Sequence, residues 1–546
     1  MKNLFSELFL SKGVNYFTGD KPLKSILDFF GLGDKLDLAE MGKYVSEELI
    51  ELLDFIDHSA KPMLHTWSAL GERIDYVRLS PDHYNALIEL QKMGVIGSMF
   101  SPSNSLMQHF LSGYIISDSG IFCTLTLTAQ TAYAVDKYAD EPIRSKFMKL
   151  FLDENNPWFG ATFYTETQGG SDLGANLTVA SRKDGWYYLS GTDKYFASNA
   201  GVADLAVVTA RVEGSHEGAK GISVFLVPAY LDDGSQNYRI RRIKDKLGTT
   251  AVPTGEVEFE NSKAYLLGDS PEGIYIAMEI LTISRIDDAI AAVGMARKAL
   301  WEAVRFADRR TAFGKRVIEQ PLMIKDLAER EAELEAALVV SLLSALKFNS
   351  AKGRKPPYDD EYQYARLLSS MAKNMASDTS AEITRYAMEI EGGIGFLEEF
   401  PMAKFHRDSI VTSIWEGTSN IQALEFLEVL ARKNGSQLLF SDLERNIGAI
   451  RDSNASEVLN EQLLRLKGRV KQMLSSDNPQ FFSKDVLRES GLLLAAVYMF
   501  RIGESGTGDS ALMLKSAEIF ARRHFRPDDP ELENLIMLSG LFDWMR

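Results

Sequence analysis

Two stretches of sequence, DLAVVTARV at residues 204–212 and ISVFLVPAYL at residues 222–231, decide the fold class of this chain. Both are short, rich in β-branched and aromatic residues, and bounded by turn-forming residues, which is the composition of β-strands. The segments WYYLSG at 186–191 and GEVEFEN at 255–261 have the same character. Together they predict a β section that runs from about residue 158 to residue 268.

Helical patterns lie on both sides of this β section. From about Leu38 to Asp153 the apolar residues recur at steps of three and four, as in MGKYVSEELIELLDFI at 41–56. IKDLAEREAELEAALVVSLLSALKF at 324–348 has almost no helix breaker, which is typical of a helical bundle. Residues 456–476 form another amphipathic pattern. The order of helices, strands and helices predicts an α+β fold.

The length of 546 residues predicts several domains. Helix is expected to return at about Pro271, and the turn pair Asn434-Gly435 marks a further boundary. We expect an N-terminal extension at 1–40, an N-terminal α-domain at 41–157, a central β-domain at 158–270, a C-terminal helical bundle at 271–435 and an added helical domain at 436–546.

Composition excludes several classes of protein. Hydrophobic residues make up 45% and charged residues 25%, which excludes collagen-like and broadly disordered chains. The net charge of −16 disfavours binding to nucleic acid or an anionic membrane. The longest strongly apolar run, 491–500, is too short for a membrane span, and the N-terminus is a poor signal peptide. We therefore expect a cytoplasmic protein.

Cysteine and histidine usage argues against a metal site. Cys123 is the only cysteine, so neither an intramolecular disulfide nor a cysteine-based zinc site can form. The seven histidines show no HExxH motif and no closely spaced pair. We predict no metal, and a reducing compartment fits this composition.

Two candidate sites contain groups suited to acid–base or cofactor chemistry. TETQGGSD at 165–172 offers hydroxyls beside adjacent glycines, which let a backbone approach a flat or phosphorylated cofactor closely. A plain Gly-Ser turn is the alternative. Glu416 follows a tryptophan, and an apolar setting would tune its carboxylate as a base. Helix capping by Thr418 or Ser419 is the alternative there.

Two further motifs combine glycine with basic or aromatic residues. RTAFGK at 310–315 carries an arginine that can bind phosphate and a phenylalanine that can pack on a ring system. EGGIGF at 391–396 breaks a helical region with three glycines, as expected where a backbone passes close to a ligand. An exposed basic turn and a helix-terminating loop are the respective alternatives.

In this order, the motifs resemble the acyl-CoA dehydrogenase family over about residues 80–433. TETQGGSDLGAN is similar to the family's flavin-binding loop, KYFASNAGVADLAVVTAR to its next strand pair, and RTAFGK, EGGIGF and IWEGTSNIQ stand in the family's order. GERIDYVRLSP, RRIKDKLGTTAVPTGEVEF, EQPLM and SIWEGTSN more closely resemble the AidB-like branch. The resemblance implies an N-terminal helical domain, a central β-domain, a C-terminal four-helix bundle and an added C-terminal helical segment.

The resemblance also implies a reaction. Family members bind FAD and remove hydrogens from the α and β carbons of an acyl-CoA thioester. By position, Glu416 would take the α-proton while the β-hydride passes to flavin N5. The backbone N–H of Glu416 would help to polarise the thioester carbonyl. An electron-transferring flavoprotein is the expected electron acceptor, and a homotetramer is the expected assembly.

Site residues carry over by position. Those implied for the substrate are Ser171, Arg285 and Gly417. Those implied for FAD are Tyr164, Thr165, Gly170, Ser171, Phe196, Ser198, Arg310, Phe313, Gln320, Glu389, Gly392, Gly393, Thr418 and Asn420.

Some positions depart from the family pattern. Glu389 stands where glutamine is common, and Pro321 takes another glutamine's place, with Gln320 one position earlier. Asp287 and Asp288 would repel a CoA phosphate if they faced it.

Other functions fit the same motifs. A flavoprotein with little dehydrogenase turnover, acting in stress protection, DNA binding or acyl-CoA and lipid binding, is one alternative. Its DNA-binding form needs a basic surface, whereas residues 436–546 hold 14 basic and 16 acidic residues. An acyl-CoA oxidase is another. Dehydrogenation of an acyl-CoA is the favoured hypothesis.

Overall fold

A computed structural model describes residues 7–101, 105–269 and 272–546. It divides into two compact units. We call residues 52–109 and 118–284 the sheet unit, and residues 1–51, 110–117 and 285–546 the helical unit. Each unit is described by itself. The predicted return of helix at Pro271 lies outside the described residues.

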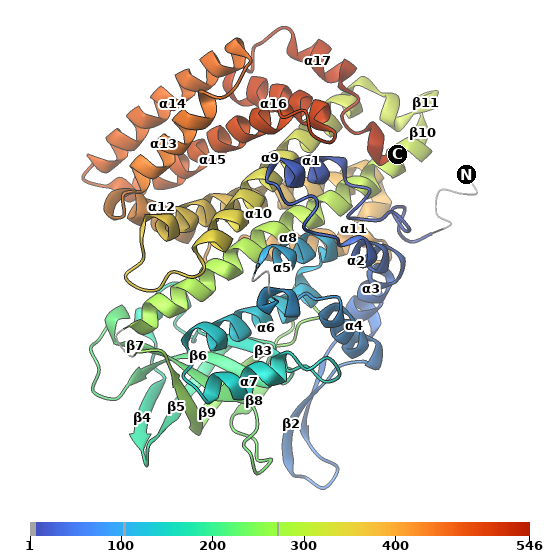
Figure 1. The fold of residues 1–546 in the computed structure, drawn as a ribbon. Helices are drawn as coiled ribbons and strands as arrows, with labels where there is room; N and C mark the ends of the chain where they lie inside the picture. Colours follow the sequence, from blue (N-terminus) through green and yellow to red (C-terminus); the bar gives the residue numbers. More distant parts are fainter. Residues whose placement is uncertain (1–6, 102–104, 270–271) are drawn as a thin grey trace. The chain divides into compact units, whose positions relative to one another are not determined.

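The sheet unit is built on seven strands whose pairings close on themselves (Figure 1). The closed path runs β6–β4–β5–β9–β7–β6, while β3 pairs in parallel with β6 and β8 pairs with β9. Buried apolar side chains of these strands form one core. The β section is therefore confirmed, and its strands are β3 (Gly160–Phe163), β4 (Val179–Lys183), β5 (Trp186–Ser198), β6 (Leu205–Val212), β7 (Ile222–Pro228), β8 (Arg239–Ile243) and β9 (Thr254–Leu267).

Helices precede the sheet in sequence. Pro142 is the N-cap residue of α7. Asp118 begins α6 by accepting hydrogen bonds from the backbone N–H groups of Gly120 and Ile121, both at 2.9 Å. These helices are α3 (Ile50–Ser59), α4 (Pro81–Lys92), α6 (Ser119–Tyr138) and α7 (Ile143–Phe151).

A hairpin interrupts the region that the spacing predicts as helical. Strands β1 (Met63–Trp67) and β2 (Arg73–Arg78) pair antiparallel. Val77 joins the sheet core, and the buried carboxylate of Asp75 accepts from the backbone N–H of Ile240 at 2.9 Å. The helical prediction is wrong here because these contacts come from distant strands, which local spacing does not contain.

The helical unit is organised around long helices that pack side by side, as α9 does with α10 and α10 with α12. The predicted helix at 324–348 lies inside α9. The helices of this region are α8 (Gly273–Arg309, in this unit from Arg285), α9 (Pro321–Ala351), α10 (Asp360–Glu391), α11 (Pro401–Val411) and α12 (Ser419–Arg432).

The remaining helices of this unit come from both ends of the chain. α15 packs against α12 and α9, and α16 packs against α9 and contacts α1. Asn434 adopts a left-handed φ of 58° between α12 and α13, as the turn signal predicts. The bounds are α1 (Lys21–Phe29), α2 (Ala39–Tyr44), α5 (Met107–Ile116), α13 (Gly435–Ile447), α14 (Ser453–Leu474), α15 (Pro479–Gly503), α16 (Ser510–Phe525) and α17 (Leu532–Ser539).

One helix among the described residues, α9, is long and apolar enough to cross a membrane by length and composition. In the structure, 78% of its most apolar window is buried. This burial identifies α9 as a core helix of the bundle.

Candidate active site

Glu416 lies in a tight turn between α11 and α12. Its φ is 56°, and that of Gly417 is 94°, so both residues adopt the left-handed conformation. A non-glycine residue pays a steric cost there and persists only when its surroundings hold it. Thr418 is the N-cap residue of α12, but its side chain makes no capping hydrogen bond. The turn therefore serves more than the start of a helix.

Three side chains hold the carbonyl groups of this turn. Arg285 Nε donates to the Glu416 carbonyl at 3.1 Å. Lys373 Nζ donates to the Gly417 carbonyl at 2.8 Å. Gln422 Nε2 donates to both carbonyls, at 3.1 and 2.9 Å. These donors come from α8, α10 and α12, so the turn is fixed by three helices.

Behind the turn lies a buried charged pair. Lys373 Nζ is 3.6 Å from Asp288 Oδ2, and both side chains are almost fully buried. Trp415 Nε1 donates to Asp288 Oδ1. Burial raises the pKa of Asp288 to about 8, against the opposing effect of Lys373, and burial lowers the pKa of Lys373. Asp288 therefore faces the ammonium of Lys373, which the sequence analysis did not single out.

Arg285 is only 2% exposed. Its Nη1 lies 3.7 Å from Glu425 Oε1. The same carboxylate accepts from Arg366 Nε at 2.8 Å. The predicted substrate residue thus stands among charged groups behind the turn.

A second group of predicted residues meets around the hairpin of β10 (Thr311–Ala312) and β11 (Lys315–Arg316). Gln320 Nε2 donates to the Ala312 carbonyl at 3.2 Å. Phe313 forms the turn with a φ of 52° and is 98% exposed. Arg310 Nη1 would lie 3.9 Å from a Cβ built on Gly392. The structure therefore brings the RTAFGK and EGGIGF motifs together.

The EGGIGF motif starts at the end of α10. Gly392 and Gly393 are exposed, and a Cβ at Gly393 would meet no atom within 4 Å. Glu389 is exposed and ion-paired with Arg385. Glu391 is buried, and burial, with a smaller effect of Glu302, raises its pKa to about 8. Glu391 begins the motif singled out in the sequence, but its burial could not be predicted there.

Asn420, in the first turn of α12, is exposed. Its Oδ1 lies 3.4 Å from Lys484 Nζ on α15. The added helices therefore contact one of the predicted cofactor residues.

In the sheet unit, the predicted flavin loop is held by a buried ion pair. Glu166 Oε1 lies 2.9 Å from Lys194 Nζ, and it also accepts from the backbone N–H and hydroxyl of Thr178 at 3.1 and 2.6 Å. Burial would raise the pKa of Glu166, but Lys194 and these hydrogen bonds lower it to about 2. Burial lowers the pKa of Lys194 to about 8. The sequence analysis did not find this pair.

The ion pair places the loop against β5. The Thr165 carbonyl accepts from the Tyr195 backbone N–H at 2.8 Å, and Tyr164 is buried. A Cβ on Gly170 would lie 2.3 Å from Thr165 Oγ1, so the turn needs glycine there. Ser171 is exposed.

Further along β5, Phe196 exposes 54% of its side chain, with Lys244 Nζ 4.7 Å from its ring centre. Ser198 Oγ lies 3.1 Å from Thr254 Oγ1 of β9. Tyr164, Thr165, Gly170 and Ser171 of the loop, and Phe196 and Ser198 of β5, therefore belong to one connected region of the sheet unit.

The helical unit holds the other predicted residues, in two groups. One surrounds the turn and contains Arg285, Glu416, Gly417, Thr418 and Asn420. The other surrounds the hairpin and contains Arg310, Phe313, Gln320, Gly392 and Gly393, with Glu389 one turn earlier on α10.

The residues around the hairpin fit a dinucleotide cofactor. Exposed glycine backbone without a Cβ allows a phosphate group to approach, and Arg310 supplies a guanidinium beside it. Phe313 offers an exposed aromatic ring on which a ring system could pack.

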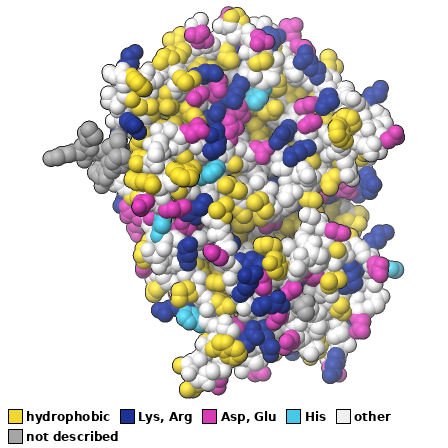
Figure 2. All heavy atoms as spheres, turned by 180° about the vertical axis from the view of Figure 1, so that it is seen from behind, with side chains coloured by type: hydrophobic (Ala, Val, Ile, Leu, Met, Phe, Trp, Pro, Cys, Tyr) yellow, Lys and Arg dark blue, Asp and Glu magenta, His cyan; other side chains and the backbone are white. Residues whose placement is uncertain are grey.

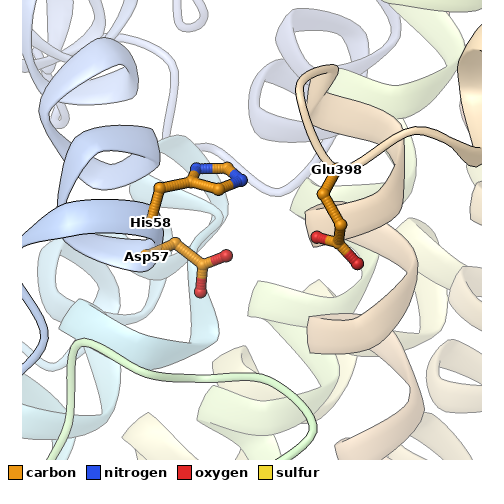
Figure 3. Close-up of side chains that lie close together, drawn as sticks. All are labelled: Asp57, His58 and Glu398. Carbon is orange, nitrogen blue, oxygen red and sulfur yellow. The ribbon is translucent and has the colours of Figure 1, made fainter.

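Asp57, His58 and Glu398 are drawn in Figure 3. Asp57 Oδ1 accepts from Thr250 Oγ1 at 2.6 Å, and His58 Nδ1 lies 2.9 Å from the Asp54 carbonyl. Glu398 accepts from Arg407 Nη2 at 2.8 Å. Both carboxylates already have a partner within their own unit, so we assign no metal to these residues.

Comparison with protein families gives three matches along the chain. Residues 10–154 match the adaptive response protein AidB N-terminal domain. Residues 161–262 match the acyl-CoA dehydrogenase middle domain, and residues 271–431 match the acyl-CoA dehydrogenase C-terminal domain.

Individual proteins give the same picture. The chain is 36% identical over 281 residues to the putative acyl-CoA dehydrogenase AidB of Escherichia coli, a region that covers 51% of this chain and 49% of that protein. It is 30% identical over 351 residues to the short-chain specific acyl-CoA dehydrogenase of Megasphaera elsdenii, covering 62% and 87%. Caenorhabditis elegans ACDH-11, solved in complex with C11-CoA, shares the fold, with a TM-score of 0.82, 22% identity and coverage of 94% and 92%.

Proposed function

We propose the function of this protein from one premise, which is that the chain belongs to the acyl-CoA dehydrogenase family. Its cofactor is FAD, which this family uses. The reaction is the α,β-dehydrogenation of an acyl-CoA thioester. The observation that carries this proposal is the Glu416 turn, because a carboxylate stands there on a backbone fixed by donors from three helices.

Glu416 is the proposed base. An α-proton next to a thioester is weakly acidic, so its removal needs a carboxylate held in place and a polarised carbonyl. Glu416 takes the proton, and its backbone N–H donates to the thioester oxygen. Bound FAD supplies the acceptor for the hydride that leaves the β carbon. Arg285, Gly417 and Ser171 are the proposed substrate contacts.

The proposed FAD contacts are the positions that the family resemblance implies. Arg310 and Phe313, with the exposed backbone of Gly392 and Gly393, would reach the FAD of a neighbouring subunit. Phe196 would lie against the flavin ring system. The remaining proposed contacts are Tyr164, Thr165, Gly170, Ser171, Ser198, Gln320, Glu389, Thr418 and Asn420.

An anaerobic titration of the purified holoenzyme tests this function. Butyryl-, octanoyl- and palmitoyl-CoA are added in turn while the visible flavin band is recorded. We expect at least one to bleach the band, and the Glu416→Gln variant to bind FAD but lose bleaching. Bleaching that survives in this variant would remove Glu416 from the mechanism.

The AidB-like alternative has its own support, namely the match of residues 10–154 and the 36% identity to AidB. This alternative is a flavoprotein with little turnover, acting in stress protection, DNA binding or acyl-CoA binding. Figure 2 shows acidic and basic side chains interspersed on the face drawn. Bound flavin that no acyl-CoA bleaches, together with a gel shift of duplex DNA at physiological salt, would favour this alternative.

Four further expectations about the setting of the reaction complete the proposal. They are a role in fatty acid metabolism, an electron-transferring flavoprotein as electron acceptor, a homotetrameric assembly and a cytoplasmic location. Peroxide formation in air would indicate an acyl-CoA oxidase instead of a dehydrogenase.

A further inference from the structure

We propose that Lys373 and Asp288 are positioning residues that hold the Glu416–Gly417 turn in its left-handed conformation. The inference rests on the proposed role of Glu416 and deepens it, because it identifies how the base is kept in place. Lys373 donates to the carbonyl of Gly417, and Asp288 holds both Lys373 and Trp415 in place beside the turn. Neither residue is assigned a contact with substrate or cofactor.

The turn needs such support. The φ of 56° at Glu416 is costly for a residue with a side chain and persists only when its surroundings hold it. Gln422 is a neighbour in sequence and follows the turn, whereas Arg285 and Lys373 reach it from α8 and α10. Lys373 brings a full charge to a carbonyl at 2.8 Å, and such charge-assisted hydrogen bonds are the stronger kind.

Lys373 in turn needs Asp288. The Lys373 side chain is 1% exposed, and a polar group buried this deeply is costly unless polar partners surround it. Asp288 Oδ2, at 3.6 Å from Lys373 Nζ, is such a partner besides the Gly417 carbonyl. Trp415 Nε1 fixes the other oxygen of Asp288, so the residue directly before Glu416 is tied to the same carboxylate.

Other charged groups surround the pair without replacing it. Arg285 on α8 opposes the charge on Lys373, whereas Glu416 favours it. Glu425 on α12 is engaged by Arg366. Asp288 is therefore the carboxylate in ion-pair distance of Lys373 among the described residues.

Deuterium exchange of the full-length holoenzyme tests, without substrate, whether Lys373 and Asp288 hold the turn. Exchange is read by mass spectrometry on a peptide covering residues 411–421. We expect Lys373→Met and Asp288→Asn to speed exchange in this peptide. Lys298→Met is the matched control, since Lys298 is 2% exposed and donates to the Ile116 carbonyl at 2.7 Å, away from the turn. Equal exchange in all three variants and the parent overturns the proposal.

Kinetics add a second readout. Displacing a catalytic base by about 1 Å can slow the reaction about 100-fold. We therefore expect kcat to fall by about tenfold to 100-fold in Lys373→Met, with KM little changed and FAD still bound. Lys373→Arg, which keeps a charged donor, should recover part of kcat. An unchanged kcat in Lys373→Met overturns the proposal.

The two readouts separate this proposal from the proposed function. If no acyl-CoA bleaches the flavin band of the parent protein, the proposed function fails. The exchange comparison still decides whether Lys373 and Asp288 hold the turn. If Lys373→Met does not fold, Asp288→Asn, which is nearly isosteric, decides the same question.

Discussion

At the scale of single residues, the site depends on backbone conformations that few side chains tolerate. Glu416 and Gly417 both have positive φ, and the second of them has no room for a side chain. A Cβ at Gly417 would lie 2.9 Å from Gln422 Nε2 and from Ile421 Cγ2. The turn is therefore sensitive to a single methyl group.

Gly417→Ala should lower the free energy of unfolding by about 1–3 kcal/mol because the new side chain is strained at this φ and crowds Gln422. Urea denaturation measures the change. Gly353→Ala is the control, since a Cβ there meets no atom within 4 Å and no positive φ is involved. Equal effects of the two substitutions would contradict the prediction.

Glu391 should make stability depend on pH. Its pKa is raised to about 8 by burial, so the folded state keeps a proton that the unfolded state releases near pH 4.5. Stability from this group therefore falls as pH rises from about 4.5 to about 8 and levels off above that. Glu391→Gln should gain about 4 kcal/mol over the parent at pH 8, because one pKa unit corresponds to about 1.4 kcal/mol, and almost nothing at pH 4.5.

Thermal unfolding of both proteins at the two pH values checks this expectation. Glu399→Gln, at an exposed position in the same loop region, is the control and should change Tm little at either pH. A gain for Glu391→Gln that is the same at both pH values would show that the carboxyl does not titrate as expected.

At the scale of elements, the loop after β3 depends on β5. Glu166 on the loop and Lys194 on the strand form a buried pair, and Glu166 also accepts hydrogen bonds from Leu177 and Thr178 near β4. The ion pair therefore joins three pieces of the sheet unit. The Thr165 carbonyl adds a backbone hydrogen bond to the same strand.

Lys194→Met should cost about 3–5 kcal/mol because it leaves the Glu166 carboxylate buried without its cation. Glu166→Gln in the same chain should restore part of this loss. A double-mutant cycle by urea denaturation measures the coupling. Single and double variants whose effects simply add would contradict the prediction.

At the scale of the whole molecule, α8 ties the N-terminal segment to the helical unit. Glu302 accepts from the backbone N–H groups of Leu10 and Ser11 at 2.6 and 2.8 Å. Arg297 Nε lies 3.2 Å from Asp20 Oδ2, and its Nη1 binds Glu331 at 2.5 Å. The N-terminal extension is thus held by buried charges as well as by apolar packing.

Asp20→Ala should destabilise the protein by about 3 kcal/mol, because it leaves Arg297 with one partner fewer and removes the cap of α1 at Leu23. Asp34→Ala, at an exposed position of the same segment, is the control. Urea denaturation compares the two. If the Asp20→Ala variant unfolds at the same urea concentration as the Asp34→Ala control, the N-terminal segment does not depend on this contact.

The sequence by itself determined the order of helices, strands and helices, because apolar periodicity and β-branched composition are local properties. It also determined the motifs around Glu416, RTAFGK and EGGIGF, since their residue types and order are written in the chain. The family follows from them and is confirmed by the comparisons. The roles of the individual site residues stay predictions.

Tertiary structure alone decided how these motifs are held. The β1–β2 hairpin exists because Asp75 and Val77 meet the distant strands of the sheet. Lys373 meets Asp288, and Lys194 meets Glu166, only after helices and strands from separate parts of the chain have packed together. A buried charge is stable only beside its partner, and neither spacing nor composition records which distant residue that partner is.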